Sequence, residues 1–276
     1  MNQEHVAHCI NTLGAFCGRR DIPSLTPYEL RKKYGFEQAD IMVLFGGSII
    51  CGSDILANAM QKGIAKKYII VGGVGHTTET LRIKMHQQFP EVTTAGLPEA
   101  KVFANYLKFK YKLEPDYLEC SSTNCGNNIT YLLDLLKEHH IVFRSIILCQ
   151  DATMQLRMAA SLRKYKPDIT IVNYAAYLVD VVVRDNKLIY NEVPWGMWDM
   201  ERYIALLTGE ISRLSDDADG YGPKGKNYLV HVEVPQDVRN AFESLKEKYG
   251  DIVRKANPAK CTQTINEKEI DRVNIL

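Results

Sequence analysis

The sequence feature that most constrains the fold is a short apolar run ending in glycine, which occurs twice. Residues 67–71 lead into Gly72-Gly73-Val74-Gly75-His76, and residues 40–45 lead into Gly46-Gly47-Ser48. An apolar run of this length, bounded by glycine, is typical of a buried strand. The two runs lie about 26 residues apart, which is the spacing of a βαβ unit. The pair therefore predicts parallel strands whose carboxyl ends meet at one edge of a sheet.

Strands and helices continue to alternate to about residue 175. This alternation predicts an α/β protein with a Rossmann-like, doubly wound, mainly parallel sheet, helices on both faces and the first strand at the centre. The predicted strands are residues 40–46, 67–72, 117–119, 144–149 and 169–172. The predicted helices are residues 3–18, a short one capped by Thr26, residues 53–62, 77–89, one from residue 98, one ending near residue 139, and residues 153–165, 198–214 and 235–249.

Three regions follow from this pattern. Residues 1–36 are expected to be N-terminal helices that pack on the core, and residues 37–175 to be the Rossmann-like core itself. Residues 176–276 are expected to be a smaller, mostly helical C-terminal addition that begins with a hairpin around Asp185-Asn186. The tail from Lys255 is polar and is expected to be poorly ordered.

The two glycine loops are the first candidate binding site. Ligands of open α/β sheets bind beyond the carboxyl ends of the strands, where the strand order reverses. Glycine there lets backbone amides approach a ligand without a Cβ in the way; the alternative is that the glycines only form tight turns. His76 is a candidate for a ligand hydrogen bond or proton transfer, or else a solvent-facing residue at a helix start. The loop is not the dinucleotide fingerprint, because Thr78 stands where that motif requires glycine.

The second candidate is the polar segment Ser121–Asn128 between a strand and a helix. Capping a helix requires only one polar side chain, and this segment offers several. Asn124 and Asn128 are one turn apart on one helix face, an arrangement that suits reading a ligand's polar edge. Cys125 in the first turn is either a nucleophile or a packing residue. We favour packing, because no base lies close to it in the sequence.

Three charged residues complete the candidate site. Asp151 follows a strand, where it binds a ribose hydroxyl or an ammonium group, or caps the next helix. Arg157 pairs with a ligand anion, with Asp151 or with a neighbouring acid. Glu99 either contacts the ligand or simply opens a helix, where a carboxylate is favourable. The predicted ligand-binding residues are therefore Gly46, Gly47, Ser48, Gly72, Gly73, Gly75, His76, Glu99, Thr123, Asn124, Asn128, Asp151, Thr153, Met154 and Arg157.

Composition excludes several classes of partner. A net charge of +1 gives no reason to expect nucleic acid or an anionic membrane. The seven cysteines are scattered without a C-x-x-C pair, which indicates a reducing compartment and no zinc ribbon. No metal site is expected. The acidic stretch 217–220 resembles the start of a calcium loop, but Lys226 stands where such a loop needs a glutamate. Without a signal peptide or a long apolar segment, we expect a cytoplasmic protein with no membrane span.

Taken together, these motifs resemble a known bacterial family over residues 38–235. They are Gly46-Gly47-Ser48, Gly72-Gly73-Val74-Gly75-His76, Glu99-Ala100, Glu119, Ser122–Asn128, Asp151–Gln155, Leu207–Glu210, Asp217–Gly225 and His231-Val232. The chain resembles the domain-of-unknown-function family that contains SanA, ElyC and YdcF, and most closely its YdcF-like branch. The resemblance implies a Rossmann-like core and a nucleotide-type ligand at the strand ends, with S-adenosylmethionine as the candidate cofactor.

The chain also departs from that family. The family's acidic residue before the last asparagine is Asn127 here, the histidine often found in the final motif is Thr153, and the arginine expected near Leu156 is Arg157. These changes weaken an acid–base mechanism and leave a binding site largely intact. SanA-like and ElyC-like members carry an N-terminal membrane anchor, which is not seen in this sequence.

The leading functional hypothesis is a protein that binds S-adenosylmethionine or a related adenosine ligand. A transferase is the enzyme class considered first, because methyl transfer depends mostly on positioning. One alternative is a hydrolase or phosphoryl-group enzyme acting on a cell-envelope precursor, with His76 and either Glu99 or Glu119 as acid and base. Another is a non-catalytic small-molecule binding protein. In each case the expected partner is a small molecule.

Overall fold

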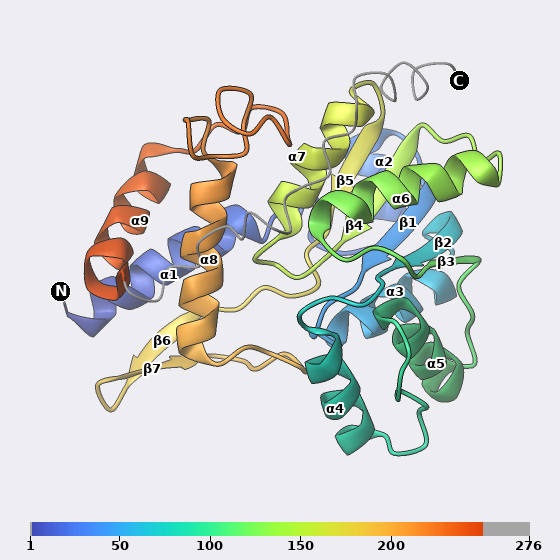
Figure 1. Cartoon of the computed structure of the whole chain (residues 1–276), viewed down its shortest axis with the longest axis horizontal. Coiled ribbons are helices and arrows are strands. Elements are labelled where there is room, and N and C mark those ends of the chain that lie inside the picture. Colours follow the sequence, from blue (N-terminus) through green and yellow to red (C-terminus); the bar gives the residue numbers. More distant parts are fainter. Residues whose placement is uncertain (1, 251–276) are drawn as a thin grey trace.

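A five-stranded parallel sheet forms the centre of the molecule, as the computed structural model of residues 2–250 shows (Figure 1). Its strand order is β3-β2-β1-β4-β5, so the first strand is central, as predicted. Each strand pairs in parallel with its neighbours. This confirms the Rossmann-like fold. The strands are β1 (Ala39–Phe45), β2 (Ala65–Val71), β3 (Tyr117–Glu119), β4 (Ser145–Cys149) and β5 (Thr170–Asn173).

Helices cover both faces of the sheet, because successive residues of each strand point in opposite directions. On one face, Ile41 and Val43 of β1 pack with α6 and α7. On the other face, Met42 and Leu44 pack with α3 and α5. The helices that follow the core strands are α3 (Cys51–Gln61), α4 (Thr78–Gln88), α5 (Glu99–Tyr111), α6 (Cys125–Glu138) and α7 (Gln155–Tyr165).

The C-terminal part begins with the predicted hairpin, formed by β6 (Val181–Arg184) and β7 (Lys187–Tyr190). Asp185 and Asn186 both have positive φ, which is the geometry of the tight turn that suits a two-residue hairpin. The helices α8 (Met200–Leu214) and α9 (Gln236–Tyr249) follow. The predicted tail from Lys255 lies outside the described residues.

The two N-terminal helices are α1 (Gln3–Cys17) and α2 (Pro27–Tyr34). The first packs against α8, α9 and the hairpin, so the start of the chain joins the C-terminal layer (Figure 1). Asn11 holds α1 against the hairpin. Its side-chain amide donates to the carbonyl of Val181 and accepts from the N–H of Val181. Because α1 also packs against α9, the two ends of the described part lie side by side.

The predicted cap Thr26 is present, and the other helices begin in different ways. Thr26 caps α2 by accepting from the N–H of Glu29 at 3.2 Å, and Asn124 caps α6 by accepting from the N–H of Asn127 at 3.0 Å. Thr77 stands at the start of α4 but makes no side-chain capping bond, and the hydroxyls of Thr77 and Thr78 donate to Glu99 instead. Helices α3 and α7 likewise begin without a side-chain cap.

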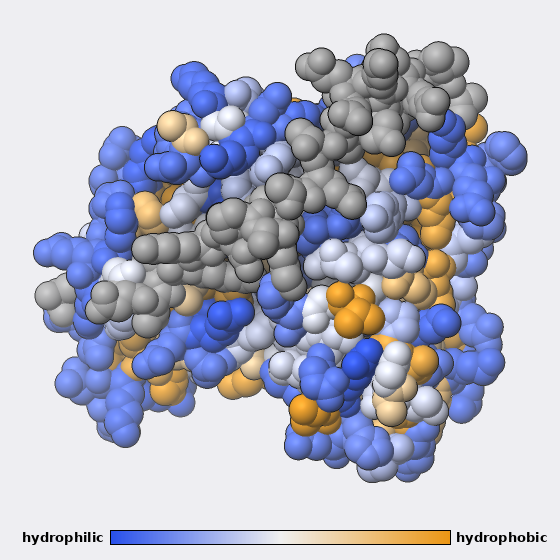
Figure 2. Space-filling view, viewed as in Figure 1, coloured by the Kyte–Doolittle hydropathy of each residue, from blue (hydrophilic) through white to orange (hydrophobic). Residues whose placement is uncertain are grey.

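Among residues 2–250, no helix has the length and apolar character needed to cross a bilayer. On the face shown in Figure 2, outside the grey atoms, hydrophilic side chains predominate and apolar ones are scattered. Val74 and Val193 are examples of large apolar residues exposed to solvent. Single apolar side chains of this kind are normal on protein surfaces.

Candidate functional site

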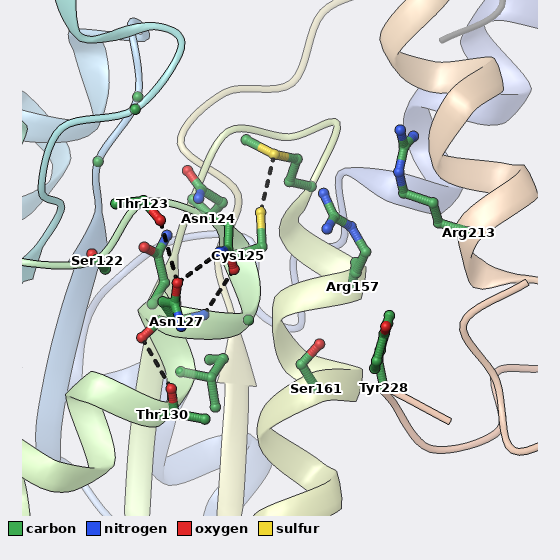
Figure 3. A pocket seen from close by; sticks show the side chains of 18 of the residues that line it. Ser122, Thr123, Asn124, Cys125, Asn127, Thr130, Arg157, Ser161, Arg213 and Tyr228 are labelled. Atoms are coloured by element: carbon green, nitrogen blue, oxygen red, sulfur yellow. Dashed lines mark hydrogen bonds between the residues drawn. The ribbon is translucent and has the colours of Figure 1, made fainter. Parts of the chain in front are cut away.

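A cavity of about 490 Å³ opens at the carboxyl ends of the central strands, and we call it the rim cavity (Figure 3). The strand order reverses between β1 and β4, and the loops after both strands contribute to its wall. This is the position at which open α/β sheets bind ligands. Most of the predicted site residues line it; the exceptions are Ser48, Gly72 and Thr153.

The predicted glycines divide into two groups. A Cβ on Gly46 would lie 2.5 Å from the Glu99 carboxylate, and one on Gly73 would lie 2.3 Å from the carbonyl of Ser122. These positions are filled by the protein's own chain. A Cβ on Gly47 would meet nothing within 4 Å, and one on Gly75 would meet only the Thr123 carbonyl at 3.5 Å. Gly47 and Gly75 are thus the glycines that leave space for a ligand.

Two of the predicted residues that miss the cavity are covered by the chain. Gly72 packs against Gly46, since a Cβ on Gly72 would lie 3.1 Å from the Cα of Gly46. Ser48 is fully buried beneath the segment before α8, where a Cβ on Gly196 would lie 2.6 Å from the Ser48 carbonyl. Both residues therefore pack between loops, and neither lines the cavity with the other predicted site residues.

Glu99 is a buried acid on the wall of the rim cavity. Its Oε1 accepts from the hydroxyls of Thr77 at 3.0 Å and Thr78 at 2.9 Å. Burial raises the pKa of this carboxyl, and the two hydroxyl donors oppose that effect by favouring the ionised form. Exposed His76 lines the same cavity. The two residues give the site a pair of groups able to exchange protons with a bound molecule.

The segment before and within the first turn of α6 forms the polar wall of the cavity (Figure 3). The Asn124 side chain donates to Oδ1 of Asn127 at 2.6 Å, and the Thr123 hydroxyl reaches the same oxygen at 3.3 Å. Asn128 lines the cavity one turn further on. The sulfur of Cys125 lies 3.7 Å from the Met154 sulfur, a contact that supports the packing interpretation of this cysteine.

Asp151 lines the cavity, but its oxygens are occupied by protein donors. Its Oδ1 accepts from the N–H and hydroxyl of Thr153, both at 2.9 Å, and from the Tyr177 hydroxyl at 2.8 Å. Its Oδ2 accepts from Trp198 Nε1 at 2.8 Å. Burial raises the pKa of Asp151, and these four donors counter that effect. Asp151 does not cap α7, which begins at Gln155 without a side-chain cap; it holds the turn before that helix. The Thr153 hydroxyl therefore lies on Asp151 rather than on a ligand.

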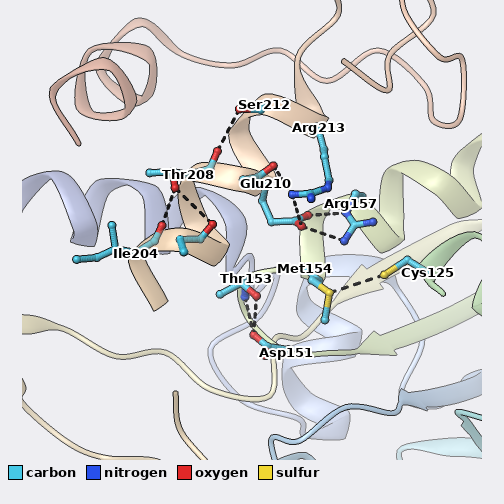
Figure 4. A network of polar contacts seen from close by, with 12 residues as sticks. Cys125, Asp151, Thr153, Met154, Arg157, Ile204, Thr208, Glu210, Ser212 and Arg213 are labelled. Carbon is cyan, nitrogen blue, oxygen red and sulfur yellow. Dashed lines mark hydrogen bonds and ion pairs between the residues drawn. The ribbon is translucent and has the colours of Figure 1, made fainter. Parts of the chain in front are cut away.

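Arg157 forms a buried ion pair with Glu210 of α8 (Figure 4). Its Nε and Nη2 donate to the two carboxylate oxygens at 2.5 and 2.9 Å. Arg213, one turn further along α8, places Nη1 3.6 Å from the same carboxylate. Of the three partners predicted for Arg157, the one observed is a neighbouring acid, Glu210. Their ion pair joins the core to the C-terminal part.

Several cavity residues are absent from the predicted set. They include Thr77, Gln150, Ser161, Lys164 and residues of the C-terminal part such as Trp198, Arg213, Tyr221, Lys226 and Tyr228. One signal was available in the sequence: Glu210 lies among Leu207 and Ile211 on the apolar side of α8, and a carboxylate in that position needs a buried partner. No feature of the nearby sequence indicates that the loop after α8 returns to the cavity.

Among residues 2–250, no group of three His, Cys, Asp or Glu side chains is arranged to hold a metal ion. No protein-family model matches the chain. The resemblance to the family of SanA, ElyC and YdcF therefore stays a prediction.

Proposed function

We propose that this protein binds a nucleotide-type small molecule in the rim cavity, with S-adenosylmethionine or a related adenosine compound as the ligand class. The observation that carries the proposal is the position of the cavity. It lies where the strand order reverses, between the loops after β1 and β4. Nucleotide ligands of doubly wound sheets bind at this place.

The composition of the wall supports a polar ligand with several hydrogen-bonding groups. Gly47 and Gly75 leave their backbone open, so a ligand can approach the main chain. Thr123 and Asn128 supply side-chain donors and acceptors from the start of α6. Glu99 supplies a carboxylate for hydroxyl or ammonium groups. Transfer of a group from such a ligand to an acceptor would require positioning of both, and His76 and Glu99 could move the accompanying proton.

A panel of four ligands tests the proposal: S-adenosylmethionine, S-adenosylhomocysteine, ATP and NAD. We expect at least one to raise the melting temperature, because ligand at 100 times its dissociation constant stabilises the folded state by about 2.7 kcal/mol. Asn128→Ala should weaken that ligand several-fold, since it removes about one hydrogen bond's worth of free energy, roughly 1 kcal/mol. Differential scanning fluorimetry followed by isothermal titration calorimetry measures both effects.

Asn240→Ala is the matched control, because Asn240 lies exposed on α9 and does not line the cavity. Its affinity for the ligand should equal that of the unmodified protein. If none of the four compounds shifts the melting temperature at millimolar concentration, the adenosine-ligand proposal is wrong.

A further inference from the structure

We propose that two residues of the rim cavity, Gln150 and Glu99, together bind the adjacent hydroxyl groups of a ribose. Both residues line the cavity beside the ends of the central strands. The inference rests on the proposed function, which it deepens by naming the ligand class as ribonucleosides in preference to deoxyribonucleosides. All four compounds of the panel contain such a ribose, so the assignment applies to each of them.

Gln150, the residue after β4, offers a hydrogen-bond donor without a partner. Its N–H donates to Gln155 at 3.0 Å, and its carbonyl accepts from Ala176 at 2.8 Å. Its side-chain Oε1 accepts from the Asp151 N–H at 2.7 Å, which fixes the end of the amide that is oxygen. Only 2% of Gln150 is exposed, and its Nε2 has no hydrogen-bond partner among the described residues. Such a donor costs free energy, which a ligand oxygen recovers.

A second glutamine shows how the fold treats a buried amide that faces only protein. The Oε1 of Gln155 accepts from the Gln150 N–H, and its Nε2 donates to the Leu148 carbonyl and to the Asn173 side chain, each at 3.1 Å. Gln155 is completely buried and does not line the cavity. Of these two amides, the unpaired one is the one that lines the cavity, which indicates that its partner belongs to a ligand.

Glu99 offers the matching acceptor. Its Oε1 accepts from the hydroxyls of Thr77 and Thr78, and its Oε2 makes no hydrogen bond within residues 2–250. The two threonines hold the carboxylate in one orientation, with Oε2 toward Gly46, where a Cβ would lie 2.5 Å away. One oxygen is therefore occupied by the protein, and the other is available to a ligand.

The register of the sheet brings this acceptor close to the donor. Leu44 of β1 pairs with Cys149 of β4. Gly46, against which the free Glu99 oxygen lies, comes two residues after Leu44, and Gln150 comes directly after Cys149. Both groups therefore lie at the crevice between β1 and β4, where the strand order reverses.

Hydroxyl groups suit this pair, because a hydroxyl can donate to a carboxylate and can accept from an amide. An ammonium group would pair with Glu99 but would present a further donor to Gln150. A ligand carboxylate would meet the negative charge of Glu99. Of two adjacent ribose hydroxyls, one can donate to Glu99 Oε2 while the other accepts from Gln150 Nε2. Carboxylates near the strand ends of doubly wound sheets bind ribose hydroxyls in this way.

Calorimetric titrations of the whole chain with adenosine, 2′-deoxyadenosine, 3′-deoxyadenosine and 5′-deoxyadenosine test the assignment. We expect loss of the 2′ or the 3′ hydroxyl to weaken binding by about tenfold, because a buried donor or acceptor is then left without a partner. Loss of the 5′ hydroxyl is the ligand control, and it should leave the dissociation constant nearly unchanged, since that group is not one of the two adjacent hydroxyls.

Two variants test the two side chains. Glu99→Gln keeps the shape but removes the charge, so the preference for adenosine over its 2′ and 3′ deoxy analogues should fall to about threefold or less. Gln150→Glu keeps the oxygen that accepts from Asp151 but replaces the donor, and it should reduce the same preference. Glu247→Gln is the matched control and should keep the full preference, because Glu247 is exposed on α9 and does not line the cavity.

Equal dissociation constants for adenosine and for its 2′ and 3′ deoxy analogues would overturn the ribose assignment and leave the proposed nucleotide site in place. An equal loss of affinity for all four nucleosides in Glu99→Gln would show a purely structural role and would also overturn it. Binding of a panel compound without binding of any nucleoside would have the same consequence. If neither the nucleosides nor the panel compounds bind, the proposed function fails as well.

Discussion

Replacing Glu210 by glutamine is expected to lower the free energy of unfolding by about 3 to 5 kcal/mol. The variant keeps the shape of the side chain but removes the one carboxylate that Arg157 and Arg213 share. The Arg157 guanidinium is largely buried and remains charged, so it would lose the carboxylate that holds both its Nε and its Nη2. Urea denaturation followed by circular dichroism measures the change.

Glu243→Gln is the control for this variant. Glu243 forms an ion pair with Lys246 on α9 at 3.6 Å, and both side chains are more than half exposed. Exposed pairs contribute between about 0 and 1 kcal/mol, so its unfolding free energy should hardly change. A Glu210→Gln protein as stable as the Glu243→Gln protein would contradict the view that this buried network joins α7 to α8.

Gly73→Ala is expected to destabilise the protein by about 3 kcal/mol, whereas Gly75→Ala should change the unfolding free energy by no more than about 0.5 kcal/mol. The difference arises because a Cβ on Gly73 would lie 2.3 Å from the Ser122 carbonyl and 2.8 Å from that of Cys120. Both neighbours are backbone atoms, which cannot rotate away. At Gly75 the nearest atom is 3.5 Å away, an ordinary contact.

The same pair separates folding from ligand binding. Gly75 borders the open part of the cavity, so the added methyl group should weaken the ligand found in the panel while the protein remains folded. Urea denaturation and calorimetry on the two variants give the two readouts. Equal stability of both variants would show that the close approach of Gly73 to the segment after β3 is not rigid.

Local signals in the sequence predicted the fold well. The apolar runs ending in glycine located β1 and β2, and Asp185-Asn186 located the hairpin turn. These signals are local because a strand's burial and a turn's positive φ are decided within a few residues. The alternation of strands and helices then left few topologies, of which the observed order is the usual Rossmann one.

The sequence did not predict in which direction the individual loop residues point. Gly73 and Gly75 stand two residues apart in one motif and both line the cavity, yet a Cβ on Gly73 would meet the Ser122 carbonyl at 2.3 Å, whereas one on Gly75 would have space. The difference depends on which backbone crosses nearby, and that segment lies about 50 residues further along the chain. Ser48 and Thr153 illustrate the same limit, because each belongs to a correctly placed loop and points elsewhere.

Neither the identity of the acid that pairs with Arg157 nor the return of the loop after α8 to the cavity was predicted, for a related reason. Arg157 and Glu210 are 53 residues apart, and the loop after α8 brings Lys226 back to α7 only in the folded protein. Neither residue belongs to a motif with recognisable spacing. Pairing of this kind depends on the packing of the C-terminal part against the core, which residue patterns do not specify.

The most direct test of the nucleotide-site proposal is amide hydrogen exchange of the whole chain with and without each of the four panel compounds. We expect the compound that binds to slow exchange in residues 46–48, 73–76 and 122–130, which form or adjoin the wall of the rim cavity. Residues 79–96, which line a second, separate hollow, should exchange at unchanged rates. Protection confined to residues 79–96, or no protection by any compound, would contradict the assignment of the rim cavity as the binding site.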